Sequence, residues 1–317
     1  MTFNELKYII AVSQTRHFGK AAQMCGISQP SLSVAIKKLE NELGVIIFER
    51  RTADIVPTPV GERIIRQARS VIAAAEQIHE IAQVARDPLS CPLRVGIIFT
   101  VSPYLLPELV KRCIARTPDM PLLITENYTA NLLMKLREGT IDAAILALPI
   151  SEPGLMVADL YDEDFIVALP KRHPLAEQQK ISPSQLGNEK LLILAQGNCF
   201  RDQVLEVCPE SMRIGNTGEG LGQTLEGSSL ATIRHMVASN LGVSVFPASV
   251  RNYDINDSLV EYREFTDPVP SRRIAIVWRK SFPRQEAIQE VIDSCAQVRL
   301  EGIKHLDPNI RQLQSNF

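Results

Sequence analysis

The feature that most constrains this chain is a long helical repeat running from residue 59 to residue 86. Thr58-Pro59 is a typical helix start and Asp87-Pro88 a typical stop, so the pattern predicts one helix of about 28 residues, ~42 Å long. A helix of this length links two regions more readily than it fits inside one small domain. Its apolar positions are Ile64, Ile65, Ala68, Val71, Ile72, Ala75, Ile78 and Ala82.

The seam of this helix favours pairing with a second copy of the chain. Positions 65, 68, 72, 75, 79 and 82 follow the alternating threes and fours of a coiled coil, interrupted by His79. The alternative is that the helix packs on its own domain. Because it joins two dissimilar regions, we predict that it is a dimerisation helix.

The residues before the long helix predict three short helices and a wing. Apolar spacing places helices over residues 3–13, 18–25 and 28–43. Gly26 interrupts the pattern, Ser28 is a typical N-cap, and Gly44 ends the third helix. A tight turn with a glycine between two helices is typical of a helix-turn-helix. Residues 45–58 resemble a short two-stranded wing.

After residue 92 the pattern changes to alternating strands and helices. We expect strands over 93–99, 121–126 and 141–148, with helices over 105–116 and 130–138 between them. A second block runs from 165 to about 260. A late strand over 272–279 is expected to return to the first block, before a last helix over 284–300 and a frayed tail after Gly302. The fold class is therefore α/β, with two lobes joined by two crossings and a cleft between them.

Composition and charge narrow the class of protein. With 45% hydrophobic and 22% charged residues, the chain is neither disordered nor collagen-like, and it has no apolar run long enough to span a membrane. Its polar N-terminus does not resemble a signal peptide, and six cysteines without a Cys-x-x-Cys indicate reduced thiols and no zinc site. We expect a cytoplasmic protein without cofactors.

The charge of the chain is unevenly distributed. Residues 1–70 hold ten Lys/Arg and six Asp/Glu, a net charge of +4, whereas the whole chain has a net charge of −2. This excess of positive charge suggests a module that binds a polyanion.

The N-terminal motifs resemble the LysR-type transcriptional regulators. The resemblance rests on Ala21-Ala22, Ser28-Gln29-Pro30-Ser31-Leu32-Ser33, Ile36-Lys37-Lys38-Leu39-Glu40, Leu43-Gly44, Phe48-Glu49-Arg50 and Thr58-Pro59-Val60-Gly61. It implies a winged helix-turn-helix over residues 1–58, a linker and dimerisation helix over 59–88, and a two-lobed effector domain resembling periplasmic binding proteins over 89–305. Lobe I would hold about 89–163 and 267–300, and lobe II about 164–266. The segments 100–107, 126–129, 198–208 and 227–237 are similar to the peroxide-sensing members of the family.

The resemblance assigns DNA contacts to the third helix and the wing. Small polar side chains early in a helix allow close approach to base edges, and basic side chains bind phosphates. The expected DNA-binding residues are Ser28, Gln29, Pro30, Ser31, Ser33, Lys37, Arg50 and Arg51.

Cys199 is the one cysteine whose surroundings suggest reactivity. Asn198 can cap a helix whose first turn holds the thiol, and both a helix N-terminus and the nearby Arg201 favour the thiolate. The other cysteines outside the 199–208 segment, Cys25, Cys91, Cys113 and Cys295, are expected to be inert.

The resemblance further implies a reversible disulfide between Cys199 and Cys208 and a peroxide pocket formed by Thr100, Thr129 and a cation from the Arg272-Arg273 pair, for which we predict Arg273. Thr129 also reads as the N-cap of the following helix. One departure is Asn198, where many members have a histidine. If residues 199–208 are helical, the two Cα atoms lie ~13 Å apart, so a disulfide requires that helix to unwind.

These expectations define a regulator rather than an enzyme. We predict a homotetrameric, DNA-binding activator that senses hydrogen peroxide and contacts RNA polymerase. Three alternatives use the same architecture or thiol chemistry. The first is a family member that binds a small organic metabolite in the cleft lined by Thr100, Thr129 and Ser229; the others are a thiol peroxidase, which would not need a DNA-binding module, and a periplasmic solute-binding protein, which would need a signal peptide.

Overall fold

The computed structural model describes residues 1–50, 55–84, 87–209, 225–252 and 259–313. It divides into two compact units, one formed by residues 1–87 with 134–141 and the other by residues 88–133 with 142–317. Within the described residues, no helix is both long and apolar enough to cross a membrane.

The first unit contains the predicted helix-turn-helix and wing. Its elements are α1 (Phe3–Thr15), α2 (Phe18–Met24), α3 (Gln29–Leu43), β1 (Phe48–Arg50), β2 (Ile55–Pro57) and α4 (Pro59–Val84). Local capping sets the helix bounds. The Ser28 hydroxyl accepts a hydrogen bond from the Ser31 N–H, and Gly44 ends α3 in the left-handed conformation. Leu32, Ile36 and Leu39 of α3 lie in the core of the unit.

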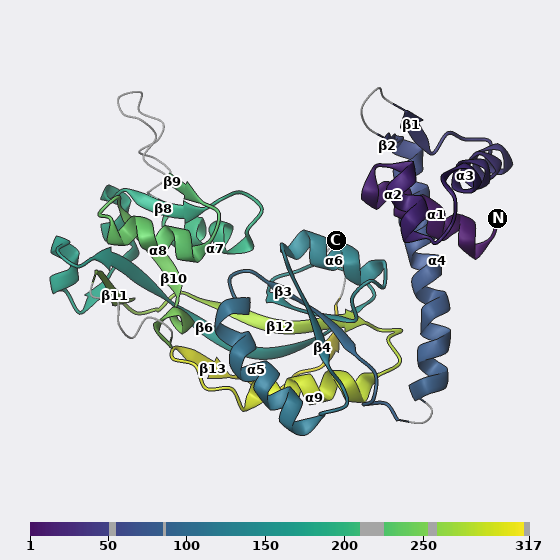
Figure 1. The fold of residues 1–317 in the computed structure, drawn as a ribbon. Coiled ribbons are helices and arrows are strands. Elements are labelled where there is room, and N and C mark those ends of the chain that lie inside the picture. The colour runs from purple at the N-terminus through teal and green to yellow at the C-terminus, as the bar shows by residue number, and fades with distance from the viewer. Residues whose placement is uncertain (51–54, 85–86, 210–224, 253–258, 314–317) are drawn as a thin grey trace. The chain divides into compact units, whose positions relative to one another are not determined.

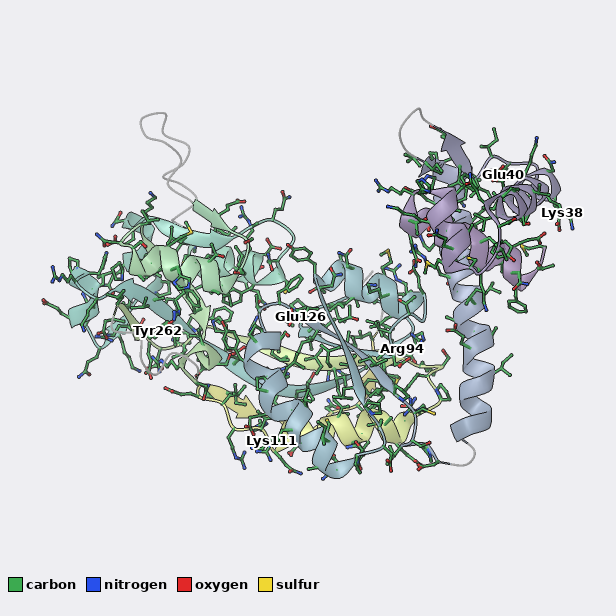
Figure 2. All side chains as sticks on the ribbon, in the orientation of Figure 1. Lys38, Glu40, Arg94, Lys111, Glu126 and Tyr262 are labelled. Atoms are coloured by element: carbon green, nitrogen blue, oxygen red, sulfur yellow. The ribbon has the colours of Figure 1, made fainter. Side chains whose placement is uncertain are left out.

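The wing is held against the helices by two side chains. A carboxylate oxygen of Glu40 accepts from the backbone N–H groups of Ile47 and Phe48, at 2.7 and 3.2 Å. The Thr58 hydroxyl donates to Ile46 O and accepts from the N–H of Gly61. A Cβ at position 61 would collide with the Ile47 carbonyl, so the first turn of α4 packs this closely only with glycine. Glu40 and the outward-pointing Lys38 mark the two sides of α3 in Figure 2.

Helix α4 packs on its own unit over its first half. Ile65 and Ala68 of the predicted seam are buried in the core of the helix-turn-helix. At these two positions the helix therefore packs on its own domain, which is the alternative to dimerisation. Further along α4, Val71 is 36% exposed and Ile78 is 68% exposed. The helix is described as far as Val84, so the predicted end at Arg86 lies outside the described residues.

The second unit begins with parallel β-α-β pairing, as the alternating pattern predicts. Its first elements are β3 (Leu93–Ile98), α5 (Ser102–Arg116), β4 (Leu122–Asn127), α6 (Thr129–Arg137), of which residues 134–137 are counted with the first unit, and β5 (Ala143–Ala147). Strand β3 lies between β4 and β5 and is parallel to both. Helix α5 begins at Ser102 rather than at the predicted residue 105, because Pro103 fits the first turn, where no N–H is needed.

One strand runs through both lobes of this unit. Strand β6 (Leu155–Pro170) pairs with β12 (Ser271–Arg279) over residues 155–164 and with β10 (Val243–Pro247) and β11 (Val260–Phe265) over residues 165–170. The first crossing between the lobes is therefore a continuous strand, visible in Figure 1, in a segment for which the sequence pattern predicts no element before residue 165. The second crossing joins β11 to β12.

The second lobe surrounds its own strands with short helices. It contains the 3-10 helix Pro174–Glu177, β7 (Lys180–Ile181), the 3-10 helix Pro183–Asn188, β8 (Leu191–Leu194), α7 (Cys199–Val207), β9 (Leu225–Gly227), α8 (Leu230–Ala238) and the 3-10 helix Ala248–Asn252. Strand β8 is parallel to both β9 and β10. Phe200 and Val204 of α7 lie in the lobe's hydrophobic core.

The C-terminal end returns to the first lobe. Helix α9 (Gln285–Ala296) is shorter than the predicted 284–300, and the tail predicted to be frayed holds two short strands within its described residues, 303–313. Strands β13 (Ile303–His305) and β14 (Arg311–Gln312) both pair with β6. Arg311 strengthens this pairing with two hydrogen bonds to Asp159, each 2.9 Å long.

Candidate functional site

A small cavity brings Cys199 together with the ends of two strands from the first lobe. Its walls are residues 98–100, which follow β3, residues 127–129, which follow β4, and residues 197–199, which begin α7. Because β3 and β4 are parallel and adjacent, their carboxyl ends meet at one edge of the sheet, where α/β folds bind their ligands. The volume open to the centre of a water molecule is about 10 Å³. A space of that size holds about one very small molecule.

Cys199 is the first residue of α7 and its side chain is half-buried. Gly197 turns the chain into the helix with φ +97°, a conformation that favours glycine. Asn198 occupies the N-cap position, as predicted, but its side chain makes no capping bond; its amide donates instead to Ala195 O at 3.1 Å. A thiolate at this position faces the unpaired N–H groups of the helix N-terminus, which stabilise negative charge.

Arg201, the cation predicted to favour this thiolate, is bonded to other groups in the structure. Its guanidinium donates to the carboxylate of Glu226 at 2.6 Å and to Leu194 O at 2.9 Å. The charge of Arg201 is therefore already matched by a carboxylate within its own lobe.

Thr129 presents an unsatisfied hydroxyl in the cavity wall. Its Oγ1 is buried and has no hydrogen-bond partner, although a buried polar atom usually has one. Thr129 is also the first residue of α6, so its hydroxyl does not serve as the predicted N-cap. A free buried hydroxyl beside a thiol is suited to holding a small polar molecule.

Arg272, and not Arg273, is the cation next to Thr100. Arg272 is buried and donates to the Thr100 hydroxyl at 2.8 Å and to the Thr100 carbonyl at 3.0 Å. Arg273 extends to the opposite face of β12 and pairs with Asp162 and Asp159. The prediction of Arg273 is wrong because successive side chains of a strand point to opposite faces. The set that the structure brings together is Cys199, Thr100, Thr129 and Arg272.

Cys208 lies at the other end of α7 and is fully buried. It is the C-cap of the helix, and burial raises the pKa of its thiol to about 12. Helix α7 separates the two cysteines, as the sequence predicts, so their Cα atoms are ~13 Å apart and too distant for a disulfide. Both side chains are thiols in this structure.

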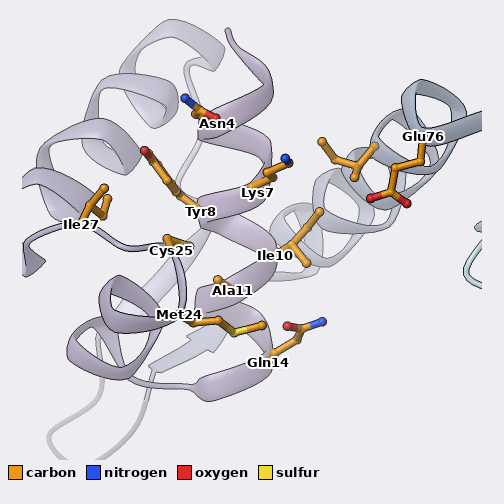
Figure 3. Close-up of a pocket in the computed structure, with 11 residues that line it drawn as sticks. Asn4, Lys7, Tyr8, Ile10, Ala11, Gln14, Met24, Cys25, Ile27 and Glu76 are labelled. Atoms are coloured by element: carbon orange, nitrogen blue, oxygen red, sulfur yellow. The ribbon is translucent and has the colours of Figure 1, made fainter. Parts of the chain in front are cut away.

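Three of the other cysteines have thiols with a raised pKa, and Cys91 is half-buried. Cys113 and Cys295 lie in the core, and burial raises the pKa of both thiols. Cys25 lies on the wall of a separate cavity of about 650 Å³ between α1, the turn after α2, and α4 (Figure 3). Burial also raises the pKa of Cys25, with a smaller opposing effect from Lys7. A raised pKa disfavours the thiolate that attacks peroxide.

The predicted DNA-binding residues whose side chains the structure describes lie on α3 and its N-cap. Ser28, Gln29, Pro30, Ser31 and Lys37 are exposed on α3 or its N-cap, and Ser33 is half-buried. Ser28 and Ser31 also bond to each other through their hydroxyls at 2.8 Å. The side chain of Arg50 and all of Arg51 lie outside the described residues. Val34, which the sequence analysis did not single out, is also exposed on α3, at 68%.

Two family models match the chain. Residues 3–62 match the bacterial regulatory helix-turn-helix protein, lysR family, and residues 86–299 match the LysR substrate binding domain. A probable hydrogen peroxide-inducible genes activator of Mycobacterium avium is 37% identical over 94% of this chain and 97% of its own length.

Solved structures agree with these matches. A full-length variant of OxyR from Pseudomonas aeruginosa is 46% identical, with a TM-score of 0.75 over 94% of this chain and 99% of that one. A hydrogen peroxide-bound mutant of OxyR from Corynebacterium glutamicum is 35% identical, with a TM-score of 0.62 over 93% of this chain and 92% of that one.

Proposed function

Since the chain belongs to the LysR family, and within it to the OxyR group of hydrogen peroxide-inducible regulators, we propose that it senses hydrogen peroxide through Cys199 and controls transcription by binding DNA. This family consists of DNA-binding regulators, not enzymes. The observation that carries the proposal is the cavity itself, where the Cys199 thiol shares a space for one very small molecule with the unpaired hydroxyl of Thr129.

In the first chemical step, Cys199 is the nucleophile and its neighbours hold the peroxide and stabilise the leaving oxygen. The Cys199 thiolate attacks one oxygen of the peroxide, the S–O bond forms, and the O–O bond breaks. Sulfur is oxidised to a sulfenic acid, and the leaving hydroxide takes up a proton to become water. Thr129 and Thr100 hold the two oxygens by hydrogen bonds, and the charge of Arg272 stabilises the negative charge on the leaving oxygen.

Cys208 completes the switch in a second step. Its sulfur attacks the sulfenic acid of Cys199, the disulfide forms, and a second water leaves. In the structure described above Cys208 is buried, protonated and ~13 Å from its partner, so α7 must unwind before this step. Unwinding also breaks the hydrogen bond from Gln203 to Leu148 O, which ties α7 to the first lobe. Reduced and oxidised proteins are therefore two discrete conformers.

The output of the switch is a change in DNA binding. In this proposal residues 1–58 bind DNA, residues 59–88 link and dimerise, and residues 89–305 sense peroxide. Refolding of α7 changes the contacts between effector domains in a homotetramer in the cytoplasm, and so the spacing of the DNA-binding units presented to RNA polymerase. Ser28, Gln29, Pro30, Ser31, Ser33, Lys37, Arg50 and Arg51 contact the DNA.

The size of the cavity argues against an organic metabolite as the signal. Sites for metabolites of ordinary size occupy ~300 Å³ or more, whereas this cavity offers about 10 Å³. Ser229, which a metabolite site was expected to use, caps α8 by accepting from the Thr232 N–H and is not among the residues of the cavity wall.

Mass spectrometry of the thiols after one equivalent of hydrogen peroxide tests the proposal. We expect a Cys199–Cys208 disulfide in the native chain, and a sulfenic acid without a disulfide in Cys208→Ser. Cys199→Ser should lose the response, and Cys113→Ser, which removes a buried cysteine outside the site, should retain it. An unmodified Cys199 in the native chain would overturn the proposal and favour a metabolite sensor.

A further inference from the structure

Glu163 and Arg272 form a buried ion pair directly behind the cavity. They face each other across the antiparallel strands β6 and β12, and both side chains are almost completely buried. The Arg272 Nε donates to the Glu163 carboxylate at 2.8 Å. The other carboxylate oxygen accepts from the backbone N–H of Ser249, at 3.2 Å, in the 3-10 helix that follows β10. Glu163 is thus fixed from both lobes.

The far end of Arg272 contacts Thr100 in the cavity wall and the side chain that follows Cys199. Its Nη atoms donate to the hydroxyl and the carbonyl of Thr100 in the first lobe. The guanidinium carbon also lies 4.9 Å from the ring centre of Phe200, the residue after Cys199 in α7. A shift of the guanidinium therefore moves the hydroxyl of Thr100 relative to the sulfur of Cys199.

The direction of the Arg272–Thr100 bond determines what Thr100 can do. A guanidinium has only donors, so the Thr100 oxygen must accept this hydrogen bond. The hydrogen of the Thr100 hydroxyl is then left to donate into the cavity. It can stabilise the oxygen that leaves when the O–O bond breaks, a role for which the Asn198 amide, which bonds to Ala195 O, is not placed.

We propose that Glu163 is a positioning residue for peroxide reduction: it orients Arg272, which in turn makes Thr100 a hydrogen-bond donor to the leaving oxygen. Glu163 is not among the nine residues of the cavity wall, so it acts through Arg272. The inference rests on the function proposed above and extends it by one residue.

The neighbouring ion pair provides a matched control. Asp162 holds Arg273 with hydrogen bonds of 2.8 and 2.9 Å, but on the opposite face of the same two strands and partly in solvent. Asp162→Asn therefore removes an equivalent charge from the next position without changing the cavity.

The test compares two reagents on the full-length chain in a Cys208→Ser background, with folding checked by circular dichroism. Stopped flow measures the rate of Cys199 oxidation by hydrogen peroxide and, separately, its alkylation by monobromobimane, which needs the thiolate but no held oxygen. Glu163→Gln should slow the peroxide reaction about tenfold and leave alkylation within about twofold. Asp162→Asn should change neither rate. Equal changes in both rates for Glu163→Gln would show a merely structural role and overturn the inference.

Two further variants keep the result decisive. If Glu163→Gln does not fold, Glu163→Asp keeps the charge but draws the carboxylate back from Arg272, and its peroxide rate alone should fall. Adding Glu163→Gln or Glu163→Asp to Thr100→Val should cause no further loss, because both changes remove the same hydrogen bond. Additive losses would contradict the inference. A native Cys199 that does not react with peroxide at all would refute the proposed function instead.

Discussion

Raising the pH should open α7 in the reduced protein, because Cys208 is packed there as a neutral thiol. Burial raises its pKa from the ordinary value of 9.0 to about 12. The packed helix thus keeps its full stability below about pH 9 and loses it as the pH rises toward 12. At about pH 10 an exposed Cys208 is mostly ionised and a packed one is not, which favours the open form by about 1.4 kcal/mol, or ~10-fold.

Alkylation of Cys208 by iodoacetamide in Cys199→Ser measures this opening, with the modified residue located by peptide mass spectrometry. A free peptide of residues 200–208 should react ~10-fold faster at about pH 10 than at about pH 8 and then level off. In the folded chain the rate at Cys208 should rise ~100-fold over that range and continue to rise, because ionisation and opening are coupled. A rate that levels off together with that of the peptide would refute the coupling.

Two further predictions concern α7 and α3. Hydrogen exchange should differ strongly between the reduced and oxidised proteins across residues 200–208 and less at the effector-domain interface; identical exchange in both forms would contradict the refolding of α7. Lys37→Ala should weaken DNA binding and lower the salt dependence by ~0.9 per lost phosphate contact, whereas Lys111→Ala, which removes an exposed lysine of α5, should not. Equal salt slopes for the two variants would contradict the assignment of α3.

Local signals made much of the fold predictable. Ser28 and Gly44 set the bounds of α3 through caps that depend only on neighbouring residues, and α7 begins where Asn198 and Cys199 predict. The parallel strands follow from apolar runs that alternate with helices. Local signals do not predict the small cavity beside Cys199, because its second and third wall segments lie about 30 and 100 residues after the first in the sequence.

The sequence patterns missed the features that depend on how the strands pair with one another. Arg272 and Arg273 have the same chemistry, and only the pairing of Arg272 with Glu163 determines which guanidinium faces Thr100. The strands β13 and β14 carry no apolar alternation of their own; they exist because β6 offers backbone partners and Asp159 binds Arg311.

The continuity of β6 limits how the second unit can transmit a signal. Of its 16 residues, 155–164 are bonded to β12 and 165–170 to β10 and β11, so turning one lobe against the other would bend β6 between residues 164 and 165. Closure of the lobes around a ligand therefore requires a bend in a strand that is hydrogen-bonded on both sides of the junction. In the function proposed above, oxidation of Cys199 instead acts through the few residues that refold around it, and these residues change the surface that the domain offers to neighbouring subunits.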